Sequence, residues 1–151
     1  FSEPLAMPRL KTFLDTQSPS LSATGLLFMR VMAALLLLFI HGLPKLLDWS
    51  GELQRIEDPF GLGAPLTLGL AVFAEVVCPL LLLLGVAARL ACLPVLAVLL
   101  VALVVVHPDW TLEQGQFAWL LVALYGGLAL TGPGAYSVSG YFWRGKAAPA
   151  I

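Results

Sequence analysis

The sequence predicts an all-α integral membrane protein: four antiparallel transmembrane helices in one bundle, with both termini in the cytoplasm. Composition is the first reason, because 60% of the 151 residues are hydrophobic and only 11% are charged. A soluble globular domain carries about 25% charged residues. The formal net charge of −1 also argues against a nucleic-acid partner. The lipid bilayer is therefore the expected surrounding of most of this chain.

Four long apolar runs are the second reason, because each is close to the length that a membrane-spanning helix needs. The expected spans are Thr24–Leu43, Pro65–Val86, Leu90–Val106 and Gln114–Thr131. They define a transmembrane domain over residues 24–134, between an N-terminal tail of residues 1–23 and a C-terminal tail of residues 135–151.

The first span follows Arg9 and Lys11, as the apolar part of a signal peptide follows basic residues. No A-x-A cleavage site follows it, and the run continues into HGLPK, so we expect a retained span. Arg30 lies about two turns inside this span. Its side chain can extend to the interface, or it can pair with an acidic residue of another helix, which we favour.

The second span carries Glu75 near its middle, where a charged side chain costs roughly 2.5–3.5 kcal/mol on insertion scales. Pro79 lacks the N–H that would bond the carbonyl of Glu75, so that carbonyl is left without its helical partner. An ion pair with Arg30 would remove much of the cost of both charges. The alternative is a protonated Glu75 in a helix kink with only a packing role.

The third span follows the second after the short turn Ala87–Arg89, so these two helices should form an antiparallel hairpin. The fourth span should end at the sequence Gly132-Pro133-Gly134. Cys78 and Cys92 both fall in apolar runs. We expect them to be small buried side chains rather than a disulfide or metal ligands.

The third reason is the distribution of charge, which also predicts the topology. One side of the expected bundle collects the basic residues Arg9, Lys11, Arg30, Arg89, Arg144 and Lys146. The other side has only Lys45 and Arg55 among basic residues, and it carries Asp48, Glu52, Glu57, Asp58, Asp109 and Glu113. The positive-inside rule therefore places both termini in the cytoplasm.

Two histidines, His41 and His107, close the first and third spans at the outer side, with Glu75 deeper in the membrane. Imidazole N–H groups can bond the carbonyl oxygens of a quinone headgroup, and histidine and glutamate can carry the coupled protons. The neighbouring binding residues would be Lys45, Asp109 and Trp110, together with Arg30, which would set the charge state of Glu75. The alternatives are plain interfacial anchors, or a metal site formed by both histidines and Asp109. No flavin, haem or metal motif occurs.

These motifs together resemble the DoxX family over roughly Leu26 to Ser139. The resemblance rests on an Arg early in the first span, HG-x-x-K at its end, A-E in the second span, an Arg directly after it, a His closing the third, and G-P-G-x-x-S after the fourth. The motif positions are Arg30, His41, Gly42, Lys45, Glu75, Arg89 and His107. In the family the last motif is usually followed by Leu-Asp, which Val138-Ser139 replaces here, so no cytoplasmic role can be assigned to that Asp.

The resemblance implies a small four-helix protein of the bacterial inner membrane that takes part in quinone-linked redox chemistry. Some members are subunits of a thiosulfate:quinone oxidoreductase or terminal oxidase complex, and others are linked to oxidative stress and thiol redox complexes. We expect a quinone-binding subunit that works with a redox partner protein, and the resemblance also allows a homo-oligomer. Two other functions stay open: a non-enzymatic anchor or assembly partner of a redox protein, and a small proton-coupled transporter that uses Glu75.

Overall fold

The computed structural model describes residues 18–144, and within this range the chain forms helices and turns without a β-strand. Three helices are long and apolar enough to cross a membrane: Pro19–Leu47, Ala64–Leu84 and Ala88–Val106, of 29, 21 and 19 residues. They correspond to the first three expected spans. Residues 1–17 and 145–151 of the expected tails, with Arg9, Lys11 and Lys146, lie outside the described residues.

Each of these long helices contains one π-helical stretch. The elements in order are α2 (Pro19–Leu37), η1 (Leu38–Gly42), α3 (Leu43–Leu47), α4 (Trp49–Arg55), α5 (Ala64–Val72), η2 (Phe73–Val77), α6 (Cys78–Leu84), α7 (Ala88–Val101), η3 (Ala102–Val106), α8 (Leu112–Thr131) and α9 (Val138–Arg144). The first helix therefore begins before the expected Thr24 and continues beyond the expected Leu43.

Prolines explain where the three π-helical stretches lie. Each stretch ends two residues before a proline, namely Pro44, Pro79 or Pro108. Proline lacks an N–H, and its ring clashes with the carbonyl four residues earlier, which disrupts the α-helical hydrogen-bond pattern at these three positions, although α7 continues as an α-helix across Pro94. The wider π turn takes its place, with bonds from Leu43 N–H to the Leu38 carbonyl and from Cys78 N–H to the Phe73 carbonyl.

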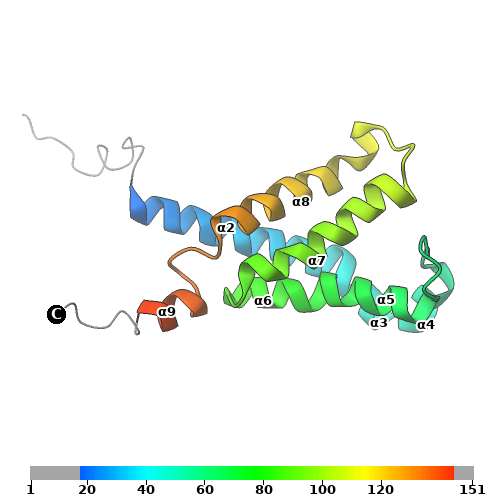
Figure 1. Cartoon of the computed structure of the whole chain (residues 1–151), viewed down its shortest axis with the longest axis horizontal. Helices are drawn as coiled ribbons and strands as arrows, with labels where there is room; N and C mark the ends of the chain where they lie inside the picture. The colour runs from blue at the N-terminus through cyan, green and yellow to red at the C-terminus, as the bar shows by residue number, and fades with distance from the viewer. Residues whose placement is uncertain (1–17, 145–151) are drawn as a thin grey trace, which may run out of the picture.

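The long helices pack side by side and run between two opposite ends of the molecule (Figure 1). Contacts join α2 to α6, α6 to α7, α7 to α8, and α8 back to α2. One end carries α9 and the turn between α6 and α7, and the other carries α3, α4 and the turn between η3 and α8. Since α6 and α7 are joined by the short turn 85–87, the expected antiparallel hairpin is confirmed.

The core lies where these helices meet, and it is built from small and aliphatic side chains. Ala33 and Ala34 on α2 are completely buried, which lets the neighbouring helices approach closely, as small residues do in membrane bundles. Tyr125 of α8 is also buried, and its hydroxyl donates to the carbonyl of Ala33 at 3.0 Å. Cys78 and Cys92 are free thiols inside this core, as expected.

The fourth expected span, Gln114–Thr131, lies within α8, which is 20 residues long. Thr111 and Gln114 form a reciprocal capping box at its start, which explains where the helix begins. This helix is not among the three that are apolar enough to span by composition. Its first turns contain Glu113 and Gln116 as well as Gln114, so they are considerably more polar than those of the other long helices.

Candidate functional site

Glu75, the acidic residue within the second span, forms an ion pair with Lys45. The Nζ atom of Lys45 lies 2.5 Å from Oε2 of Glu75, and the two side chains are 22% and 7% exposed. Lys45 comes from α3 and Glu75 from η2. The expected pairing of Glu75 with Arg30 is therefore wrong. The first helix continues past Leu43 to Leu47, and this extension brings Lys45 to the carboxylate.

Gly42 lets the two helices meet closely enough for this pair to form. A Cβ atom at position 42 would lie only 2.1 Å from the carbonyl oxygen of Glu75, so no side chain fits there. That carbonyl is the one that Pro79 leaves without its α-helical partner. The π turns η1 and η2 are in contact, and the glycine places the backbone of one directly against the backbone of the other. The first helix therefore packs directly against the backbone carbonyl of Glu75.

His41 is the third polar residue at this position. Its ring is half-buried and lies beside Phe117 of α8, with 5.7 Å between ring centroids. It precedes Lys45 by four residues, about one helical turn, on the same helix. Within residues 18–144 no hydrogen-bond partner occupies its ring nitrogens. We call His41, Lys45 and Glu75 the ion-pair cluster; it combines a carboxylate, an ammonium and an imidazole.

His107 is placed differently, at the end of η3. Its ring stacks on Trp110, with 3.9 Å between centroids and an interplanar angle of 2°. Trp110 and Asp109 are exposed. In the described part of the chain, no hydrogen bond or ion pair joins these three residues to the ion-pair cluster. The same residues contain no group of three His, Cys, Asp or Glu side chains that could hold a metal ion, so the alternative site of two histidines and Asp109 is not formed there.

Arg30, nearer the start of the same helix, is held by backbone carbonyl groups of the turn after α8. It is only 2% exposed, and its guanidinium donates to the carbonyls of Pro133 and Tyr136, the latter at 2.7 Å. Gly85 makes room for it, since a Cβ there would lie 3.0 Å from Nη1. Fifteen residues separate Arg30 from Lys45 in the sequence, about 22 Å along a helix. Arg30 therefore does not line the ion-pair cluster.

Arg89 lies at the same end as Arg30. It is exposed, and a Cβ at Gly132 would lie 3.0 Å from its Nε atom. The glycines of the Gly132-Pro133-Gly134 sequence have positive φ angles of 81° and 77°, which only glycine adopts readily. The motif after α8 is thus a tight turn that Arg30 and Arg89 contact from different helices.

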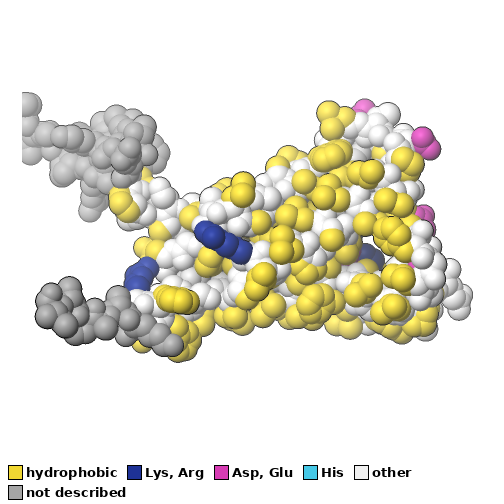
Figure 2. All heavy atoms as spheres, viewed as in Figure 1, with side chains coloured by type: hydrophobic (Ala, Val, Ile, Leu, Met, Phe, Trp, Pro, Cys, Tyr) yellow, Lys and Arg dark blue, Asp and Glu magenta, His cyan; other side chains and the backbone are white. Residues whose placement is uncertain are grey.

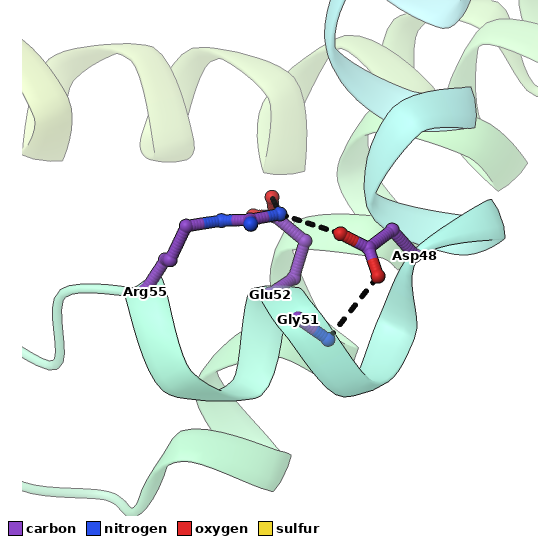
Figure 3. A network of polar contacts seen from close by, with 4 residues as sticks. All are labelled: Asp48, Gly51, Glu52 and Arg55. Carbon is purple, nitrogen blue, oxygen red and sulfur yellow. Dashed lines mark hydrogen bonds and ion pairs between the residues drawn. The ribbon is translucent and has the colours of Figure 1, made fainter.

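Beyond the ion-pair cluster, the start of α4 is held by an exposed polar network (Figure 3). Arg55 donates to the carboxylates of Asp48 and Glu52, both at 2.7 Å, and Asp48 accepts from the Gly51 N–H. The hydrogen bond from Arg55 is the main reason why the pKa of Asp48 is lowered. This network caps α4 next to the helix that carries Lys45.

Sequence reasoning recognised Lys45 as a binding residue but missed it as the partner of Glu75. The first span was expected to end at Leu43, which left Lys45 beyond the membrane-spanning segment. The signal that could have corrected this is the matched pair of prolines. Pro44 and Pro79 each produce a π turn, and the glycine of the first turn fits the freed carbonyl of the second.

These features define a multi-pass membrane protein with an ion pair buried between two helices. The chain belongs to the DoxX family, because the DoxX family model matches residues 25–108. That range contains Arg30, Arg89, His107 and the whole ion-pair cluster. No curated protein and no solved structure matches the chain significantly.

Proposed function

We propose that this protein is the membrane subunit of a quinone-linked redox system and that the ion-pair cluster binds the quinone headgroup. The observation that carries the proposal is the Lys45–Glu75 pair inside a membrane-spanning region, with His41 one turn before Lys45 on the same helix. A buried carboxylate and ammonium are costly in hydrocarbon, and such groups usually mark ligand or proton pathways. A ligand-binding or proton-carrying function would explain why these costly charged groups are present.

The donors of the cluster suit the oxygens of a quinone. An ammonium has three N–H donors, and one of those of Lys45 bonds Glu75. The side chain of Lys45 is 22% exposed, so an incoming carbonyl oxygen can reach a second donor. His41 can donate from a ring nitrogen. A bound quinone would accept electrons and protons, and Glu75 and His41 are the groups placed to hold those protons.

In this proposal, the quinone approaches the ion-pair cluster from the outer side, past His107, Asp109 and Trp110. Their segment follows η3, which contacts the first turns of α8, where a Cβ at Gly115 would lie 3.0 Å from Leu103. Phe117, two residues further along α8, lies against His41. The start of α8 therefore connects the His107 segment to the ion-pair cluster.

We further propose that α8 is the fourth span and that both termini face the cytoplasm of a bacterial inner membrane. The distribution of charge supports this orientation. In the view of Figure 2, the acidic side chains gather at the end with α4 and the turn before α8. The exposed arginines Arg89 and Arg144 belong to the opposite end, which the positive-inside rule assigns to the cytoplasm. Electrons would then come from a redox partner protein, because the chain has no flavin or haem motif.

Quinone binding by the purified protein in nanodiscs tests the proposal. We expect His41→Ala and Lys45→Met to weaken binding at least about tenfold, the equivalent of one hydrogen bond of about 1.4 kcal/mol. Arg55→Gln is the matched control, because Arg55 is a basic residue of the same end that lies outside the cluster. His107→Ala should have a smaller effect than His41→Ala. Unchanged binding in both histidine variants would refute this site.

A separate measurement distinguishes the alternatives. If the protein copurifies with a stable partner protein and has no quinone affinity, it is an anchor or assembly subunit. If Glu75→Gln abolishes proton-coupled uptake into vesicles while the wild-type protein binds no quinone, it is a transporter. Either result would replace the redox function proposed here.

A further inference from the structure

The end of the molecule that carries α9 has a surface that the proposed redox function does not use. Three consecutive aromatic residues of α9 project outward: Tyr141, Phe142 and Trp143 are 77%, 63% and 77% exposed. Large aromatic surfaces in water are unfavourable, because transfer of apolar surface out of water is favourable. This surface therefore needs an apolar or amphipathic neighbour.

α9 is held in a defined place at this end. Arg30 donates to the carbonyl of Tyr136, just before the helix, and the Ser139 N–H donates to the carbonyl of Gly85 at 3.4 Å. Arg144 in turn donates to the carbonyl of Ala135 at 3.0 Å. The aromatic residues are thus presented by a helix that is tied to the turn between α6 and α7.

The neighbouring exposed side chains indicate what covers α9. Leu84 at the end of α6 and Leu90 near the start of α7 are 58% and 68% exposed, and both belong to membrane-spanning helices. Their exposed surface faces lipid, and the aromatic surface of α9 continues it past the end of the spans. Tyrosine and tryptophan concentrate at the level of lipid headgroups, where one side of the ring is apolar and the other wet.

The charge at this end favours an anionic headgroup. Arg89 and Arg144 are exposed there. Among residues 18–144, every Asp and Glu except Glu75 lies on segments of the opposite end: Asp48, Glu52, Glu57, Asp58, Asp109 and Glu113. Figure 2 shows the same separation, with dark blue side chains and no magenta ones towards the α9 end. A guanidinium binds phosphate oxygens through a planar pair of donors.

We infer that α9 is an interfacial helix that binds anionic phospholipid, with Tyr141, Phe142 and Trp143 in the headgroup layer and Arg89 and Arg144 on the lipid phosphate. The occupant is the lipid of the leaflet at this end. The surface is at the opposite end of the bundle from the ion-pair cluster. Lipid binding by α9 is therefore independent of quinone binding at the ion-pair cluster.

Fluorescence quenching by brominated lipids tests the inference. The full chain is prepared with Trp49, Trp110 and Trp119 replaced by Phe, which leaves Trp143 as its only tryptophan. The protein is placed in nanodiscs that contain brominated phosphatidylglycerol or brominated phosphatidylcholine, with bromine close to the glycerol or near the middle of the acyl chain. We expect the shallow bromines to quench Trp143 more strongly than the deep ones, and phosphatidylglycerol to quench more strongly than phosphatidylcholine.

Charge variants then identify the headgroup contacts. A basic residue near an anionic surface contributes about fivefold in local lipid enrichment. Arg89→Gln and Arg144→Gln should each reduce the preference for phosphatidylglycerol by about that factor, whereas Arg89→Lys and Arg144→Lys should retain most of it. Arg55→Gln, at the opposite end, should leave the preference unchanged.

Two results would overturn the inference. Equal quenching by phosphatidylglycerol and phosphatidylcholine would show that no anionic headgroup is selected. Weak quenching of Trp143 by every lipid would show that α9 does not contact the bilayer.

Discussion

Arg30 and Lys45 are basic residues of the same membrane-spanning helix, yet they are neutralised in different ways. Arg30 is almost completely buried, and its guanidinium donates to two backbone carbonyls of the turn after α8. Lys45 remains partly exposed and pairs with a carboxylate, Glu75. The first cation is held by neutral dipoles, and the second is held by an opposite charge.

The difference separates a structural end of the bundle from a candidate reactive end. A guanidinium stays charged at all ordinary pH values, and its planar donors fit fixed acceptors, so Arg30 holds the turn before α9 in place. A lysine ammonium has three rotatable donors, so a lysine–glutamate pair can exchange one partner for a ligand oxygen. The polar group that can change its bonding is therefore the Lys45 pair.

The largest expected effect is that of Arg30→Met. This change removes two hydrogen bonds from a charged donor and leaves the Pro133 and Tyr136 carbonyls without it. Each bond to a charged group is worth about 1.5–3 kcal/mol, so we expect a loss of about 4 kcal/mol in unfolding free energy. Thermal unfolding in detergent measures the loss, and amide exchange should rise in α9 but not in α4. Arg55→Met, at an exposed site, is the control and should change stability far less than Arg30→Met.

Gly42→Ala should have the next largest effect. The added methyl group would collide with the backbone of Glu75, and overpacking of this kind typically costs 1–3 kcal/mol. We expect a loss of about 3 kcal/mol, because a backbone carbonyl cannot rotate away as a side chain can. Gly69→Ala is the matched control: it lies in α5, with nothing within 4 Å of its added Cβ. Equal stability of the two variants would contradict the close contact between η1 and η2.

A double-mutant cycle on Lys45 and Glu75 measures the pair itself. Contacting charges couple by roughly 0.5–3 kcal/mol. We expect about 2 kcal/mol for Lys45→Met and Glu75→Gln, because Glu75 is buried while partial exposure of Lys45 weakens the pair. Unfolding in detergent of the wild type, both single variants and the double variant measures it. If the effects of the two single variants on the unfolding free energy simply add in the double variant, the pair is not formed. Lys45 would then not differ from Arg30 by being held by an opposite charge.

The smallest effect concerns Asp48, at the cap of α4. The hydrogen bond from Arg55 lowers the pKa of its carboxyl below the ordinary 3.8. A lowered folded pKa stabilises the cap above the unfolded pKa, and this contribution is lost as the pH falls through the folded value. Carboxyl NMR of the labelled protein should show Asp48 titrating below 3.8, and Arg55→Gln should raise its midpoint. An unchanged midpoint in that variant would show that Arg55 does not hold this carboxylate.

The sequence predicted much of the fold because apolar runs and turn residues act locally. The first three spans, the hairpin formed by α6 and α7, and the burial of both cysteines all followed from patterns of neighbouring residues. The composition of α8 does not by itself identify it as a membrane span, because the polar residues of its first turns lower the mean hydropathy of the helix.

The partner of Glu75 could not be predicted in the same way. A pattern of apolar residues describes each span as a straight α-helix, but a π turn adds a residue and rotates all later side chains by about 100°. The prolines at positions 44 and 79 place such turns in both helices. The register of Lys45 relative to Glu75 therefore depends on how two distorted helices meet at Gly42.

By itself, the sequence determined that this chain enters the membrane and that a carboxylate within it must find a partner, because a lone charge in hydrocarbon is too costly. Only the tertiary structure decided which cation pairs with this carboxylate. Gly42 allows the backbones of two helices to touch, and that contact brings Lys45 to Glu75. Arg30 instead meets the carbonyls of a turn over a hundred residues away in sequence, a contact that no local pattern encodes.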